Sequence, residues 1–469
     1  MNPPPGLHAW TVHRSQGKVG PSTTLGRCVT DRDLLKRRVH ELVQHHAAAA
    51  IDVARDILDH PETGFREERT AGLVAQWFDG LGLQHRDGLA ITGVRADLTG
   101  GEPGRTVAVM GELDSLIVPG HPHAAKGTNF AHACGHHAQI GMVLAVAAAL
   151  AEPEVREQLH GNVALMAVPA EEYIELSYRL GLVADGRIEF MGGKAELVRL
   201  GVFDDVDICM LTHSSSTSDE GLLAYGSVNN GAIAKEARFI GVQAHAGSSP
   251  HLGVNALQAA MLAMAAINAN RETFQDPDSI RVHPIVTKGG DVVNAVPADV
   301  RMEMFVRGRT LDAIAEADRK VERSLRAGGL AVGAKVEVTT YSAYLPLRQD
   351  PALSDVYRLN AARVVGEENV SVARPRGSST DMGDLSHIMP TIQPNAKGAK
   401  GIVHGADFLI TDYDLAVTSP AAAMAMTVVD LLGEDGEAQR IVDGFTPALS
   451  KEAYLELQRG FNRRVTYED

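Results

Sequence analysis

Basic residues, cysteines and aromatic residues are all scarce in this chain of 469 residues. Its 44 Lys and Arg residues are outnumbered by 59 Asp and Glu residues, which gives a formal net charge of −15. Because nucleic acids and anionic membrane surfaces both require a basic face, this balance argues against either as a partner. Aromatic residues make up only 5% of the chain, so Ala, Val and Leu must supply most of its core.

The three cysteines, Cys28, Cys134 and Cys209, are odd in number and widely spaced. Such a set does not form a disulfide framework, so we expect a reducing, cytoplasmic environment. Long apolar runs are also missing, since Ile140–Ala151 falls short of the roughly 18 residues that a membrane span needs. We therefore expect neither a membrane nor a nucleic acid as partner.

The two ends of the chain differ from the rest. Residues 1–30 contain no acidic residue and lack the apolar core of a secretory signal. We interpret them as a disordered leader, with a transit peptide as the alternative. Residues 436–469 are charged and partly helical. They form a C-terminal tail to which the sequence assigns no function.

The length of the chain predicts two domains. In the first, Thr106–Met110, Asn162–Val168 and Val206–Leu211 are apolar on both faces, as buried parallel strands are, and they alternate with helical patterns. This alternation predicts an α/β catalytic domain with a mostly parallel sheet, formed by residues 31–228 and 345–435.

Residues 229–344 show a different order of expected elements: strand, helix, strand, strand, helix, strand. This order is the ferredoxin-like α+β arrangement. Because the α/β pattern resumes afterwards, we interpret this segment as a second domain inserted into the first.

Side chains that can bind metals recur where predicted strands end. Gly111–Asp114 and the pair Glu171 and Glu172 each follow a strand, and His132–His137 packs three imidazoles and a thiol into six residues. The carboxyl ends of parallel strands share one edge of a sheet, where ligands bind. Thiolate, imidazole and carboxylate groups together suit zinc and similar metals. The candidate metal ligands are Cys134, His136, Glu172, His213 and His404.

Each of these signals has another interpretation. A single histidine is more often structural than a ligand, and adjacent glutamates can form a solvated turn. Cys134 at the start of a helix could instead be a nucleophile paired with His136, because helix starts lower the pKa of thiols. On an extended chain Glu171 and Glu172 would point in opposite directions, so one could bind a metal while the other faces a water molecule.

Several short motifs occur in a fixed order between about residues 53 and 432: His60–Phe65, Gly111–Asp114, His132–His136, Glu171–Glu172, His245–Ala246, Asn294–Pro297 and Ser379–Asp384. In order and spacing they resemble the aminoacylase/carboxypeptidase-like metallopeptidases. The most similar branch holds the amino-acid amidohydrolases, the indole-acetyl-amino-acid hydrolases and the p-aminobenzoyl-glutamate hydrolases.

This resemblance implies a metal-dependent hydrolase that cleaves an amide-type C–N bond of a small, carboxylate-bearing substrate. It implies one or two divalent ions, manganese or zinc with cobalt as a further choice, held by the five candidate ligands. Glu171 matches the general base, and His245 matches a residue that stabilises the oxyanion, often from the partner subunit. Asn294 and Arg307 match substrate-binding positions. The inserted domain is implied to act as a lid and to form a homodimer.

Two departures from the family pattern leave the substrate open. His137 stands where many relatives have Asp or Asn, and the segment that begins with Tyr173 is longer than the expected Gly-rich turn. Tyr173, Tyr178 and Arg179 could bind a flat anionic ring, which would suit an aminohydrolase that releases ammonia from a nitroanthranilate. Alternatively they only cover the loop. A non-catalytic binding module is a further alternative, although every expected ligand and the base are present.

Overall fold

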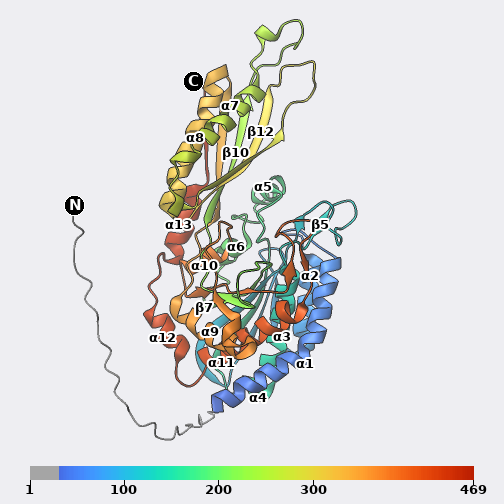
Figure 1. The fold of residues 1–469 in the computed structure, drawn as a ribbon, viewed down its shortest axis with the longest axis vertical. Coiled ribbons are helices and arrows are strands. Elements are labelled where there is room, and N and C mark those ends of the chain that lie inside the picture. The colour runs from blue at the N-terminus through green and yellow to red at the C-terminus, as the bar shows by residue number, and fades with distance from the viewer. Residues whose placement is uncertain (1–30, 469) are drawn as a thin grey trace, which may run out of the picture.

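The computed structural model describes residues 31–468, so the predicted leader and Cys28 lie outside the described residues. The described chain has a larger part, which contains the long helix α1 (Asp31–Asp59), and a narrower part that projects from it (Figure 1).

The larger part is built on a six-stranded sheet. Its order is β1 (His85–Leu89), β2 (Gly93–Thr99), β6 (His160–Val168), β3 (Glu102–Glu112), β7 (Ile208–Leu211) and β15 (Thr391–Ile392). Strands β6, β3, β7 and β15 run parallel, while β1 and β2 are antiparallel additions at one edge. The three apolar runs predicted as parallel strands are β3, β6 and β7, which confirms the α/β prediction.

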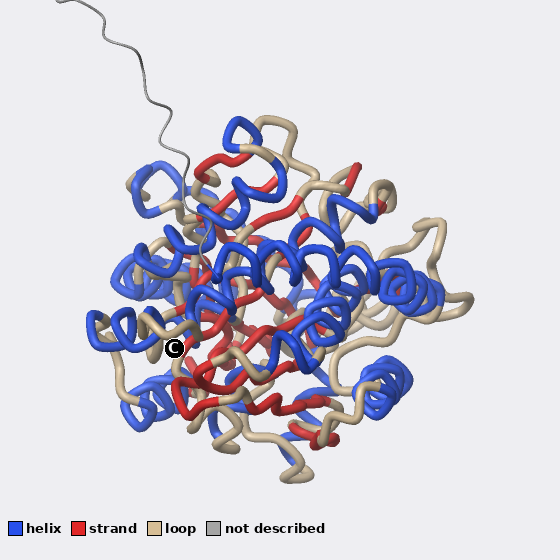
Figure 2. The backbone as a smooth tube through the Cα atoms, turned by 90° about the horizontal axis from the view of Figure 1, so that it is seen from below, coloured by secondary structure: helices blue, strands red, loops and turns tan. Residues whose placement is uncertain are grey.

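Most of the strands lie near the middle of the view in Figure 2, and helices lie around them. Helices α1, α3 (His136–Ala151), α9 (Pro351–Val365) and α11 (Ser419–Leu431) pack together on the core. By length and mean hydropathy alone, Asp414–Leu431 could cross a membrane, a stretch that the sequence pattern does not single out; 72% of this 18-residue window is buried inside the protein.

The larger part also contains a smaller, four-stranded sheet, and His213, a predicted metal ligand, lies in one of its strands. Its order is β14 (Val370–Val372), β9 (Leu223–Tyr225), β16 (Asn395–Ala396) and β8 (His213–Ser214).

The projecting part contains the predicted strand–helix–strand–strand–helix–strand unit: β10 (Gly231–Ile240), α7 (Ala256–Ala269), β11 (Arg281–Lys288), β12 (Asp299–Gly308), α8 (Leu311–Val332) and β13 (Lys335–Tyr344). The sheet order β11-β12-β10-β13 is the ferredoxin-like one, with α7 and α8 packed on it. Strand β12 begins at Asp299. Pro297, which has no N–H to donate, precedes it and disfavours extension of the ladder.

The C-terminal segment, expected as a tail, completes this second sheet. Helix α12 (Glu437–Gly444) and helix α13 (Lys451–Phe461) lead to β19 (Arg463–Tyr467), which pairs antiparallel with β13. Helix α13 also contacts the larger part, because Gln458 donates to Asp384 Oδ1 at 2.9 Å. The chain end therefore contacts both parts of the fold.

Candidate metal centre

The topology brings the predicted ligands to one edge of the central sheet. Strands β3 and β6 end at Glu112 and Val168, so Glu112 and the segment that follows β6 meet there. Helix α3 begins at the same edge after Gly135, whose φ of 91° favours glycine. A Cβ atom at Gly135 would also lie 2.8 Å from Ser214 Cβ. The glycine thus allows Cys134 and His136 to approach the loop that carries His213.

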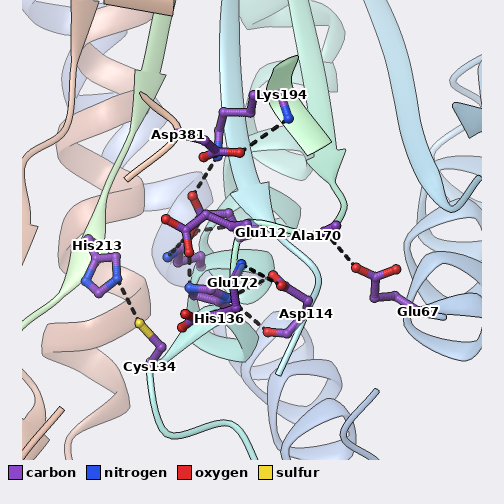
Figure 3. Close-up of polar contacts among 12 residues, drawn as sticks. Glu67, Glu112, Asp114, Cys134, His136, Ala170, Glu172, Lys194, His213 and Asp381 are labelled. Atoms are coloured by element: carbon purple, nitrogen blue, oxygen red, sulfur yellow. Dashed lines mark hydrogen bonds and ion pairs between the residues drawn. The ribbon is translucent and has the colours of Figure 1, made fainter. Parts of the chain in front are cut away.

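All five predicted ligands are brought together. Cys134 Sγ lies 3.3 Å from His213 Nε2, and His404 Nε2 lies 3.2 Å from Glu172 Oε1. The ligand atoms of Cys134, His136 and His213 lie within 4.8 Å of one another, and those of Cys134, Glu172 and His404 do so as well. Cys134 belongs to both groups (Figure 3 labels four of the five).

Several polar atoms at this centre lack hydrogen bonds. His136 Nε2 and Glu172 Oε1 are buried and have no hydrogen-bond partner among the described residues. His136 Nε2 nevertheless lies only 3.1 Å from Glu112 Oε2. Donor atoms that converge in this way without hydrogen-bond geometry are what a divalent cation requires, and the mixture of thiolate, imidazole and carboxylate suits zinc or a similar ion. The residues therefore fit a metal.

The pKa values of the candidate ligands support the same conclusion. Although burial opposes ionisation, His213 and His136 hold the pKa of the Cys134 thiol down to about 6. Glu172 raises the pKa of His404 to about 11. Burial likewise opposes ionisation of Glu172, yet His404 lowers its pKa to about 2. Protons on the imidazoles thus balance the anionic ligands, and a cation would displace these protons when it binds.

Asp114 orients two of the ligands. His136 Nδ1 lies 2.9 Å from Asp114 O, and the main-chain N–H of Glu172 donates to Asp114 Oδ2 at 2.8 Å. Contacts of this kind fix the ring of a metal-binding histidine and leave its other nitrogen for the ion. The sequence pattern points to the segment Gly111–Asp114 but does not reveal this role.

Glu171 lies inside the same cluster. It is 7% exposed, and a carboxylate oxygen of Glu171 is within 4.8 Å of ligand atoms of Glu112 and His136. Burial and the neighbouring carboxylates of Glu112 and Glu172 raise the pKa of Glu171 well above its usual value. A carboxyl group that readily holds a proton suits acid–base chemistry.

The loop before Glu171 is held in an unusual conformation. Ala170 has a φ of 54°, and its N–H donates to Glu67 Oε1 at 2.8 Å (Figure 3). Glu67 is fully buried, which together with the charge of Asp114 raises its pKa to about 8. Sequence patterns gave no signal for Glu67, because only the fold brings it to Ala170.

Comparison with known proteins identifies the family. A model of peptidase family M20/M25/M40 matches residues 108–421, more than half of the chain. The chain belongs to this family. It is similar to a mouse Xaa-Arg dipeptidase (27% identity, 90% of this chain and 95% of the relative) and to an indole-3-acetyl-aspartic acid hydrolase from Enterobacter agglomerans (28%, 85% of each). These relatives support its assignment as a metal-dependent amidohydrolase.

Solved structures agree on the fold of this M20/M25/M40 member. An aminobenzoyl-glutamate utilization protein from Klebsiella pneumoniae superposes with a TM-score of 0.64 at 22% identity, over 84% of this chain and 99% of the other. A dinuclear metal-binding peptidase from Bacillus subtilis gives a TM-score of 0.62 at 20% identity, over 83% and 99%.

The predicted substrate-binding and oxyanion residues occupy two ends of the projecting sheet. Arg307 pairs with Ala232 near the catalytic part, and the charges of Glu171 and Glu172 act on its guanidinium. His245 pairs with Ala295, next to Asn294, in loops beyond the opposite end of β10. The ten residues of β10 span about 30 Å. His245 and Asn294 therefore lie far from Arg307 within one subunit.

The polar side chains of the segment after Glu172 form hydrogen bonds within the protein. Tyr173, predicted to bind substrate, is 7% exposed, and its hydroxyl donates to Ser342 O at 2.7 Å. Tyr178 donates to Phe65 O at 3.3 Å. Arg179 is 1% exposed and donates to main-chain carbonyl groups. These contacts favour the interpretation that the three residues only cover the loop. They do not favour the alternative, in which the residues bind a flat anionic ring.

The sequence of this M20/M25/M40 member did not reveal that one lysine side chain is buried beside the metal centre. Lys194, the second residue of α6 (Gly193–Arg199), has a fully buried side chain, and its Nζ lies 2.7 Å from Glu112 Oε1 and also contacts Asp381 Oδ1 (Figure 3). Despite burial, Asp381 and Glu112 raise the pKa of Lys194, and Lys194 and His136 lower the pKa of the buried Glu112 to about 2. A lone Lys in a short helix carries no sequence signal for such a role.

We expect Lys194→Met to lower the free energy of unfolding by about 3 kcal/mol, since it leaves two buried carboxylates without their cation. Denaturant titration measures this loss. The variant Lys194→Met/Asp381→Asn removes one of the stranded charges, so its loss should be smaller than the sum of the two single losses. Additive losses would show that the ion pair does not hold these elements together.

Proposed function

We propose that the chain hydrolyses an amide-type C–N bond of a small, carboxylate-bearing substrate. The observation that carries this proposal is the convergence of Cys134, His136, Glu172, His213 and His404 beside the buried Glu171. These five residues would hold one or two divalent ions, manganese or zinc, with cobalt as a further choice. Cys134 belongs to two of the ligand groups, so it would help to hold either one ion or two.

A cation held there would lower the pKa of a water molecule and polarise the substrate carbonyl. Glu171 takes a proton from the attacking water and delivers it to the leaving nitrogen. Its raised pKa suits the second of these steps, because it favours a carboxyl group that carries the proton. Arg307 is close enough for its charge to interact with Glu171 and Glu172, so it would bind the substrate carboxylate.

The function is tested with purified protein and a panel of N-acyl amino acids, aryl-glutamates and aminobenzoates. We expect an acid fragment and an amine from a member of the first two classes, and no turnover after the cation is removed by a chelator. Ammonia without an acid fragment would instead support an aminohydrolase. Activity that survives the chelator but not a thiol alkylator would support Cys134 as a nucleophile.

Glu171→Gln should lower turnover by roughly two orders of magnitude or more and leave the bound cation unchanged, because the base is removed while the ligands stay. His404→Ala is the counterpart, since it removes a ligand and should lower the metal content measured by elemental analysis. Full turnover of Glu171→Gln would exclude Glu171 as the base. Unchanged metal content of His404→Ala would exclude His404 as a ligand.

We propose that two copies form a homodimer through the projecting domain, residues 229–344, which acts as a lid. Strand β11 lies at the edge of its sheet with Ile285 60% exposed, and Met261 on α7 is 50% exposed. An apolar sheet edge of this kind favours pairing with another chain. The distance of His245 from its own catalytic base also fits a role in the partner's site.

Sedimentation at micromolar concentration should give a dimer, and Ile285→Glu should shift it to monomer. Val372→Glu is the matched control, because Val372 is 66% exposed on the catalytic part. A monomeric wild-type protein would contradict the dimer.

We further propose a cytoplasmic location, because Cys134 and Cys209 are free thiols and a ligand thiol must stay reduced.

A further inference from the structure

The last residue of strand β13 contacts the residue proposed as the general base. Tyr344 is 5% exposed, and its hydroxyl donates to the main-chain carbonyl oxygen of Glu171 at 2.5 Å. Tyr344 pairs with Ala232 near the start of β10, which places it at the root of the lid. The lid is thus hydrogen-bonded directly to the peptide group of Glu171.

A second tyrosine makes the reciprocal contact. Tyr173, which belongs to the catalytic part, donates its hydroxyl to Ser342 O in β13. Its ring meets those of Tyr344 and Phe305 edge to face, with centroids 5.9 Å apart in both pairs. Each part of the molecule therefore donates one buried hydrogen bond to the main chain of the other, around a shared aromatic cluster.

The loop between these contacts is fixed on its other side as well. Arg179, in helix α5 (Leu176–Ala184), donates to Glu172 O and to Ala170 O, the latter at 3.4 Å. Three consecutive carbonyl groups, those of residues 170–172, consequently accept from Arg179 or Tyr344. Helix α5 lies between the catalytic part and the lid (Figure 1). A Cβ atom at Gly64 would lie 2.5 Å from Arg179 Nη2 and 2.9 Å from Ala170 Cα, so glycine is required there.

From these contacts we propose that Tyr344 is a positioning residue that couples the orientation of the lid to that of Glu171, with Tyr173 as its reciprocal partner. The inference rests on the proposed function, in which Glu171 is the base. A movement of β13 pulls on the peptide group of Glu171 and reorients its carboxylate. Small displacements of a reacting group reduce rates strongly, so this link makes turnover depend on lid position.

Tyr344→Phe removes only the hydroxyl. With the N-acyl amino acid that the wild-type enzyme hydrolyses fastest, we expect kcat to fall about three- to ten-fold, the effect of one lost hydrogen bond, while KM changes less than two-fold. Tyr173→Phe should lower kcat in the same direction and serves as the second variant if the first folds poorly. Tyr341→Phe is the matched control with unchanged kcat, because its hydroxyl donates to Glu236 Oε2, a residue of the lid.

The same substitution in the Glu171→Gln background separates positioning from a general structural role. If Tyr344 acts through Glu171, the double variant should be no slower than Glu171→Gln alone. An equal loss in both backgrounds, or an unchanged kcat of both Tyr344→Phe and Tyr173→Phe, would overturn the inference while the proposed function stands. Wild-type turnover in Glu171→Gln, or no hydrolysis by the wild-type protein, would overturn the proposed function and the inference with it.

Discussion

Charge compensation at the carboxyl edge of the central sheet is the constraint on which the rest of the structure depends. Residues no more than 7% exposed crowd this edge: Glu112, Asp114, Glu171, Glu172, Asp381 and Cys134, with Lys194 as their ammonium partner. Buried acidic groups cost free energy unless cations and hydrogen bonds offset them. Lys194 compensates two of the carboxylates and imidazoles compensate others. A divalent cation fits where the acidic groups are not fully compensated.

The backbone is shaped to serve this edge. Parallel strands end together, so residues far apart in sequence meet without long loops. Ala170 adopts a left-handed conformation that costs about 1 kcal/mol or more for a residue with a side chain. The hydrogen bond from Ala170 to Glu67 offsets this cost. The strain lies directly before Glu171, where it sets the direction in which the two glutamates leave the strand.

Much of this arrangement could be predicted from the sequence. Apolar runs mark β3, β6 and β7, and Glu172 and His213 follow two of them closely, so this edge of the sheet and part of the ligand set could be predicted from the strand ends. Cys134, His136 and His404 come from other loops and were predicted from their chemistry as ligands and from the resemblance to the metallopeptidases. Lys194 was not, since its partners come from a different strand and a distant loop and no periodicity relates them. Strand β19 was missed for a similar reason: its five mostly exposed residues become a strand only because β13 offers a free edge.

The two ends of the proposed lid differ in how they are held. Its root is bound to the catalytic part by the hydroxyls of Tyr344 and Tyr173, whereas His245 belongs to loops beyond the far end of β10. When a rigid sheet about 30 Å long turns about its root, the tip moves through the largest distance and the root through the smallest. A rotation that moves the loop of His245 would therefore displace Arg307 only slightly. That slight displacement is nevertheless transmitted to Glu171, because Tyr344 joins the same root to its peptide group.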